Sequence, residues 1–232
     1  MVVVSNVNTS TNSSLSVLAI RVSQAVKTAL REEGFHLNII KGKSIYLSVL
    51  EREHCRVLYS EDAYDFALKT EPLQIGHSIE GADEWFEDIQ KKQGKENLRL
   101  GIFLHTGEVI GDVALQGIDW RNRSCSLGVG IAKMQHRGKG YGQEAIALLL
   151  DYAFCHLGLE RVAANTLAPN IPAQRALEKC CFVLEGRQRA AVYFAGTKHD
   201  RLNYAILTDE YAKRPCESPT PPLEGGSNGG NA

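Results

Sequence analysis

Three glycines alternate at positions 138, 140 and 142, between a strand-like run that ends at residue 131 and a long amphipathic stretch. A backbone with so little side-chain bulk at the start of a helix exposes several N–H groups, and the helix dipole adds partial positive charge. Such a helix start binds anions, phosphate groups in particular. Arg137 and Lys139 place cationic side chains beside the glycines. The sequence therefore predicts a phosphate site at a strand-to-helix junction.

The spacing of the glycines excludes two common phosphate loops. The P-loop pattern requires Ser or Thr after Gly-Lys, whereas Gly138-Lys139 is followed by Gly140. The dinucleotide pattern G-x-G-x-x-G also fails, because the order here is G-x-G-x-G. The alternative is a glycine-rich turn that binds no ligand. Three glycines, two cations and a helix start in one segment argue against that alternative.

Hydrophobic periodicity on both sides of the loop predicts a mixed sheet. Before the loop, the pattern predicts strands over residues 43–50, 98–105, 108–118 and 124–131, and helices over 52–68 and 80–92. After the loop it predicts a helix ending before Gly158, a strand over 162–167, a helix over 170–180, and strands over 182–185 and 202–207 joined through a turn at Gly196. A crossover helix between strands 124–131 and 162–167 implies that these two strands are parallel.

The two ends of the chain differ in composition from the middle. We expect an N-terminal extension over residues 1–38, with an amphipathic helix at 14–33, and a folded domain over 39–211. Residues 212–232 are rich in Pro, Gly and Ser, which predicts a disordered tail. No acidic residue precedes Glu32, so an organellar targeting segment is the alternative to a helix that docks on the domain.

Composition and charge argue against several classes of protein. The 232 residues include 26 Lys and Arg against 27 Asp and Glu, a net charge of −1, which disfavours direct nucleic-acid binding. No apolar run approaches the roughly 18–20 residues that cross a bilayer, so we expect no membrane span. The six cysteines lack zinc spacing and follow no recognisable signal peptide. We therefore expect reduced thiols, no metal and a cytoplasmic location.

The loop Gln135-x-x-Gly138-x-Gly140 is similar to the Q/R-x-x-G-x-G/A loop that binds acetyl-CoA in the GNAT superfamily of N-acetyltransferases. The flanking sequence resembles the RimJ/RimL branch of that superfamily. The matching pieces include Gly111-Asp112, Leu127-Gly128, Glu144-Ala145, Asn170, Glu178-Lys179, Glu185-Gly186, Arg189 and Asp200. Because the pieces occur in order over residues 40–210, the resemblance is specific.

The resemblance implies an α/β (α+β) GNAT fold, with a mixed, mostly antiparallel central sheet that is splayed at the acetyl-CoA site and flanked by helices. The cosubstrate acetyl-CoA would lie between the strand that ends at Ile131 and strand 162–167. Backbone groups near Ile131 would pair with the pantetheine amides, and the loop N–H groups would hold the pyrophosphate. The cofactor-binding residues so implied are Ile131, Lys133, Gln135, His136, Arg137, Gly138, Lys139, Gly140, Tyr141, Gly142 and Asn170.

The implied reaction is acetyl transfer to a primary amine by direct attack in a ternary complex. Asn170 would lie near the pantetheine arm and thiol. The candidate bases on or beside the strands that normally face the substrate are Asp119, Glu108 and His105. Of these we expect Asp119 to act through a water molecule, with a turn-forming role as the alternative. Many relatives carry a Tyr as general acid where this chain has Leu177, and some carry a Ser where it has Ala173. Relatives usually carry a Gly before the Phe that matches Phe182, and this chain has Cys181 there. The alternative is therefore a non-catalytic acyl-CoA-binding or regulatory module on the same scaffold.

Charge patterning bears on the amine acceptor. Eleven acidic and three basic residues lie between Glu51 and Asp88, a region that the resemblance places over the acceptor entrance. Either these carboxylates form a solvated helix face, or they attract a cationic acceptor such as a polyamine or a basic protein N-terminus. We expect the acceptor to be a protein N-terminal amine or a small cationic amine. A homodimer is among the alternatives for the oligomeric state.

Overall fold

The computed structural model describes residues 39–61 and 78–213. The predicted helix over 14–33, the tail from 214 onward and residues 62–68 of the predicted helix over 52–68 lie outside the described residues. None of the helices that the structure describes is both long and apolar enough to cross a membrane.

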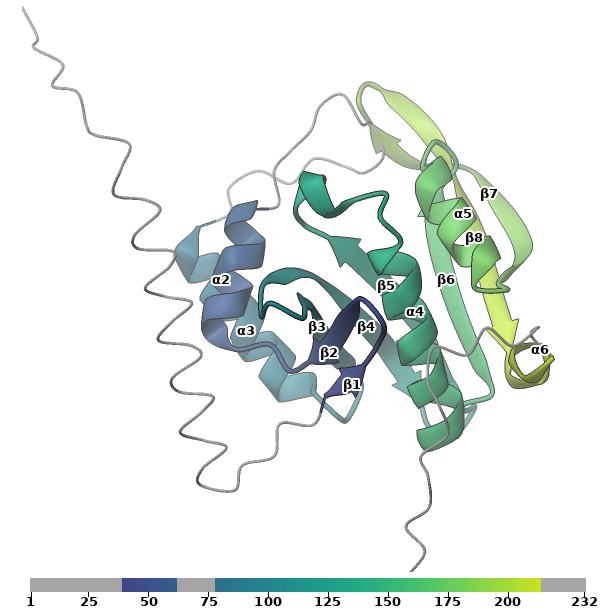
Figure 1. Ribbon diagram of the computed structural model, residues 1–232. Coiled ribbons are helices and arrows are strands. Elements are labelled where there is room, and N and C mark those ends of the chain that lie inside the picture. The colour runs from purple at the N-terminus through teal and green to yellow at the C-terminus, as the bar shows by residue number, and fades with distance from the viewer. Residues whose placement is uncertain (1–38, 62–77, 214–232) are drawn as a thin grey trace, which may run out of the picture. The chain divides into compact units, whose positions relative to one another are not determined.

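One mixed sheet organises the fold, with eight strands in the order β1-β2-β3-β4-β5-β6-β8-β7 (Figure 1). The strands are β1 (Ile40–Lys41), β2 (Ile45–Ser48), β3 (Leu98–Leu104), β4 (Val109–Asp119), β5 (Ser124–Ile131), β6 (Arg161–Leu167), β7 (Val183–Phe194) and β8 (Thr197–Leu207). Neighbouring strands are antiparallel except β5 and β6, which are parallel. The parallel pair predicted from the crossover helix is confirmed.

Five α-helices accompany the sheet in the described residues. They are α2 (Arg52–Glu61), α3 (Ile79–Lys92), α4 (Tyr141–Asp151), α5 (Ile171–Lys179) and α6 (Thr208–Ala212). Ser78 begins α3 as an N-cap, because its hydroxyl accepts the backbone N–H of Gly81 at 3.1 Å. α4 continues into a π-helical turn, Tyr152–His156, and the chain then turns at Gly158, whose φ is +64°.

Successive side chains of a strand point to opposite faces of the sheet, and helices pack against both faces. Ile102 is buried in the cluster that contains Ile146 and Leu149 of α4, whereas its neighbour Phe103 joins Cys55 of α2 and Ile89 of α3 in a second cluster. Helices α4 and α5 therefore cover one face, and α2 and α3 cover the other face over β2 to β4 (Figure 1). Among the described elements, no helix covers the second face of β6, β8 and β7.

The last hairpin is much longer than predicted. The sequence predicts strands over 182–185 and 202–207, but β7 and β8 run continuously from Val183 to Phe194 and from Thr197 to Leu207. The physical reason is exposure: nearly all side chains of β7 are solvent-accessible, so they carry no hydrophobic period. The predicted turn is present, with Gly196 at φ +79°.

Candidate active site

The parallel strands β5 and β6 separate part-way along their length. They pair from Ser124 opposite Arg161 to Leu127 opposite Ala164. Beyond those pairs β5 continues to Ile131 and β6 to Leu167 without pairing to each other. The splayed sheet predicted from the family resemblance is confirmed. The facing strand edges leave backbone groups that an extended ligand can pair with, as an added strand does.

A cavity of about 340 Å³ lies at this separation. Its walls come from β5, β6, α4 and α5, with Val192 of β7 and Arg201 of β8. The polar side chains that line it are Asn165, Thr166, Asn170 and Arg201, and most of the others are apolar. Both the size and the mostly apolar walls are typical of a small-molecule site.

The glycine loop lies at the start of α4, as predicted. Gly138 and Gly140 have φ values of +72° and +87°, which only glycine adopts without strain. A Cβ at either position would meet no atom within 4 Å, so the space beside the loop is open. Within the described part of the chain, the N–H groups of Gly138, Lys139 and Gly140 make no backbone hydrogen bond. This arrangement fits the pyrophosphate of acetyl-CoA.

Two of the predicted cosubstrate-binding cations already have protein partners. Arg137 Nε donates to the carbonyl of Ile131 at 2.8 Å, and Lys133 Nζ donates to Glu108 Oε1 at 2.8 Å. Arg137 is therefore held against the end of β5 rather than being free beside the glycines. Lys139 is exposed on the loop. The loop thus keeps its unbonded N–H groups and one exposed cation, while the segment that leads into it is bound to the sheet.

His136 is buried behind the loop. Its Nε2 lies 3.4 Å from Glu108 Oε1, its Nδ1 has no hydrogen-bond partner among the described residues, and its ring lies 6.2 Å from that of Tyr141. Burial acts to raise the pKa of the Glu108 carboxyl, but the ammonium of Lys133 and the ring of His136 hold it below its ordinary value. Glu108, Lys133 and His136 therefore fix the segment that leads into the loop.

Asn170 lies at the cavity wall and also begins α5. Its Oδ1 accepts the backbone N–H of Ala173 at 3.1 Å, which makes it the N-cap of the helix. Its Nδ2 makes no hydrogen bond within the described residues, so that donor is available to a ligand. The predicted place of Asn170, beside the gap between β5 and β6, matches the cavity that it lines.

Asp119 lies elsewhere. It is the last residue of β4, and its carboxylate accepts the backbone N–H of Asn122 at 2.9 Å and that residue's side-chain amide at 2.6 Å. These hydrogen bonds, the backbone bond foremost, hold the pKa of Asp119 below its ordinary value, which makes it a weak base. It lines a separate cavity of about 530 Å³ that shares no residue with the one at Asn170. This placement favours a turn-forming role.

The two departures from the family pattern lie in the cavity itself. Leu177 and Ala173 both contribute to its wall, where relatives are expected to carry a hydroxyl. None of the described residues that line the cavity is an Asp, Glu, His, Cys or Tyr. The described chain also has no group of three or more His, Cys, Asp or Glu side chains placed to hold a metal ion. The site therefore offers binding and orientation more than acid–base chemistry.

The cysteines that the structure describes are free thiols, and none lines this cavity. Burial raises the pKa of Cys55 and of Cys125 to about 12, so neither forms a thiolate near neutral pH. Both thiols are therefore packed core groups and unsuited to act as nucleophiles.

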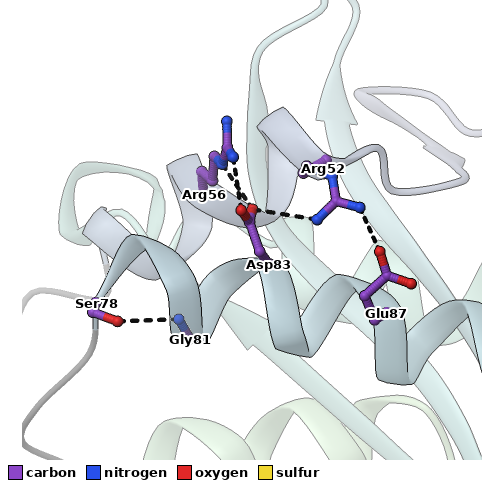
Figure 2. Close-up of polar contacts among 6 residues, drawn as sticks. All are labelled: Arg52, Arg56, Ser78, Gly81, Asp83 and Glu87. Carbon is purple, nitrogen blue, oxygen red and sulfur yellow. Dashed lines mark hydrogen bonds and ion pairs between the residues drawn. The ribbon is translucent and has the colours of Figure 1, made fainter.

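Part of the acidic region is neutralised by ion pairs between α2 and α3. Arg56 Nε and Nη2 donate to the two carboxylate oxygens of Asp83 at 2.8 and 2.7 Å, and Arg52 Nη2 donates to Glu87 Oε1 at 2.5 Å; the pairs are drawn in Figure 2. Arg52 Nη1 also lies 3.6 Å from Asp83 Oδ1. These carboxylates join the two helices, so they contribute little free negative charge to the surface. Residues 62, 65 and 71, which supply other predicted acids, lie outside the described residues.

A family model described as an acetyltransferase (GNAT) domain matches residues 52–183. The chain belongs to the GNAT acetyltransferase family. A probable N-acetyltransferase of Bacillus subtilis, YjcK, is 33% identical over 180 residues, covering 74% of this chain and 98% of the relative. The spermidine N(1)-acetyltransferase of Vibrio cholerae is 29% identical over 156 residues, covering 66% of this chain and 80% of the relative.

Solved structures show the same GNAT fold. A crystal structure of a probable acetyltransferase has a TM-score of 0.67 at 25% identity, covering 74% of this chain and 98% of that one. The Vibrio cholerae spermidine N-acetyltransferase in complex with CoA and spermine has a TM-score of 0.65 at 24% identity, covering 73% and 98%. The expected fold, the acyltransferase activity and the use of acetyl-CoA as cosubstrate are confirmed by this family membership.

Sequence reasoning missed one residue of this site and the role of another. Glu108, which the sequence offers as a candidate base, instead anchors Lys133 and His136; it lies just before β4, and no local pattern indicates that it meets the loop segment. Arg201 of β8 lines the cavity, but it lies in a stretch whose strand the periodicity failed to extend. The signal that was available for Arg201 is alternation with the buried Leu202 and Tyr204.

Proposed function

We propose that this GNAT enzyme transfers the acetyl group of acetyl-CoA to a primary amine by direct attack in a ternary complex. The observation that carries the proposal is the end of β5–β6 pairing at Leu127 and Ala164, beside a loop with unbonded N–H groups. That geometry provides a strand edge for the pantetheine amides and an anion site for the pyrophosphate. The RimJ/RimL branch and the cytoplasmic location remain parts of this proposal.

In this proposal the protein contributes chiefly by positioning. Backbone N–H groups from Gly138 to Gly142 hold the pyrophosphate, and Asn170 Nδ2 orients the reacting end of the pantetheine. Holding an amine against a thioester carbonyl in the correct geometry supplies much of the acceleration. A CoA thiol is a fair leaving group, so water can serve as the proton donor in a cavity without an acidic side chain.

Two kinds of relative support the proposed acceptor class. One is named for spermidine, a small cationic amine. Another, a putative ribosomal N-acetyltransferase of Bacillus subtilis called YdaF, is 34% identical over 108 residues, covering 47% of this chain and 58% of the relative. We propose a primary amine acceptor, with a small amine and a protein N-terminal amine as the two classes to test.

The experiment is a thiol-release assay with acetyl-CoA and a panel of amines, with product mass as the second readout. Amine-dependent thiol release and a product that carries an acetyl group support the proposal. The second candidate, a non-catalytic acyl-CoA-binding module, is favoured by Leu177 and Ala173 in the cavity wall. Tight acetyl-CoA binding without release toward any amine would favour that module and contradict the enzyme proposal.

A further inference from the structure

Arg201 is a cation in the cavity wall without a carboxylate partner. It is half-buried on β8, and its guanidinium makes no ion pair or hydrogen bond with any residue the structure describes. No Asp or Glu lines the same cavity in the described chain. A partly buried positive charge without a counter-ion is unfavourable unless a ligand or water satisfies it.

The neighbouring carboxylate does not neutralise Arg201. Asp200 accepts hydrogen bonds from Arg187 Nε at 2.5 Å and from the backbone N–H of Ala190 at 2.7 Å. Successive residues of a strand point to opposite faces, so Asp200 and Arg201 lie on different sides of the sheet. Asp200 thus secures the irregular pairing between β7 and β8, near Gln188 and Val192, and leaves Arg201 unpaired.

The strand register gives the face from which Arg201 reaches the cavity. Leu202 and Tyr204 are buried in the core beneath α4 and α5, so Arg201 points to the opposite, uncovered face. On that face it lies between Leu167 of β6 and Gln188 of β7, while the next row pairs Asn165 with Asn203. Neither asparagine side chain has a hydrogen-bond partner among the described residues.

The glycine loop lies at the start of α4, on the helix-covered side, so the phosphates of acetyl-CoA and the Arg201 side chain approach the gap from opposite faces. An anion that meets Arg201 therefore belongs to the second substrate. Arginine binds a carboxylate with two parallel hydrogen bonds, and the uncharged amides of Asn165 and Asn203 beside it add donors and acceptors.

We propose that Arg201 binds a carboxylate carried by the amine acceptor, so that the acceptor is an amino acid or a similar amine that also bears an anionic group. This inference rests on the proposed amine acetylation. It also agrees with the ion pairs of Asp83 and Glu87, which leave those carboxylates occupied by arginines rather than by a cationic acceptor.

The test uses three matched amines at each of several chain lengths: an ω-amino acid, its carboxamide and the corresponding diamine. We expect kcat/KM for the amino acid to exceed that for its amide by about 10- to 100-fold, the range for a charge-assisted hydrogen bond. Arg201→Gln is expected to abolish this preference through KM and to leave the Kd for acetyl-CoA unchanged. Arg201→Lys is expected to keep part of it.

Lys198→Gln is the matched control, because it removes one positive charge from the same strand at an exposed position outside the cavity. It should leave the preference intact. Calorimetry with the amino acid and the CoA-loaded protein gives a readout that needs no turnover. Transfer to amines with equal kcat/KM for acid and amide would overturn the inference and leave the proposed function standing. Binding that depends on Arg201, without transfer to any amine, would support the carboxylate site and overturn the proposed function.

Discussion

Asn170 Oδ1 accepts the backbone N–H of Ala173 at 3.1 Å, so the residue expected to orient the pantetheine is also the N-cap of α5. The side chain therefore has two roles that use different atoms: Oδ1 caps the helix, and Nδ2, which makes no hydrogen bond within the described residues, is the donor proposed for the ligand. Substitutions can separate them, because Asp and Ser also cap helices whereas Ala does not.

Asn170→Ala should lower the free energy of unfolding by about 1 kcal/mol through the lost cap. Asn170→Asp and Asn170→Ser should keep that stability but lose the Nδ2 donor. For all three variants we expect kcat/KM to fall roughly 5- to 150-fold, equivalent to about 1–3 kcal/mol of transition-state stabilisation. Urea denaturation and steady-state kinetics check the two effects. Unchanged kcat/KM in Asn170→Asp would remove Asn170 from the reacting centre.

Gly140→Ala should weaken acetyl-CoA binding by about tenfold or more, because a side chain would occupy the open space that the pyrophosphate approaches. Alanine at position 140 would also be strained by about 1–2 kcal/mol, because the backbone there has a positive φ. Gly94→Ala is the control for strain: its φ is +72°, its Cβ would also meet nothing within 4 Å, and it lies between α3 and β3. Equal loss of acetyl-CoA affinity by calorimetry in both variants would show that the loop is not the binding site.

Cys181 occupies the left-handed position that ends α5. Its φ is +66°, its N–H donates to the carbonyl of Glu178, and the N–H of Phe182 donates to that of Leu177, which forms a Schellman motif. Cys181→Gly should raise the free energy of unfolding by about 1 kcal/mol, because glycine adopts this conformation without strain. Cys155→Gly, the same change in the π-helical turn, should lower it by about 0.5–1 kcal/mol. A destabilised Cys181→Gly variant in urea denaturation would contradict this reading.

The Glu108 carboxylate should stabilise the folded protein in a pH-dependent way. Its pKa in the folded protein lies below the ordinary 4.5, so its contribution is present above pH 4.5 and is lost as the pH falls through the folded value. Glu108→Gln should therefore be less stable than the unmodified protein at pH 7, and the difference should shrink below pH 4.5. A stability difference that does not change with pH would show that the charge of Glu108 is not what holds Lys133 and His136.

The sequence could predict the features that depend on residues close together in the chain. The glycine loop can be recognised from its own residues, Gly138 and Gly140 among them. The parallel pairing of β5 and β6 follows from the crossover helix between them. The ion pair of Lys133 with Glu108 and the hydrogen bond of Arg137 to the carbonyl of Ile131 depend on how the loop folds back onto the sheet. No spacing of residues in the sequence predicts that fold.

The acidic region and Arg201 show the same limit for electrostatics. A count of charges cannot reveal that Asp83 and Glu87 are bound by Arg52 and Arg56 across two helices. The count also cannot reveal that Arg201 is left without a partner in the cavity wall. Charges act through their pairing, and pairing between distant segments is a property of the folded chain.

A crystal structure of the protein with acetyl-CoA tests the central claim most directly. The account predicts the pantetheine between β5 and β6, beyond Leu127 and Ala164, with the pyrophosphate on the N–H groups of residues 138–142 and the thioester beside Asn170. Acetyl-CoA bound away from this gap, or strands β5 and β6 paired along their full length in the complex, would contradict it.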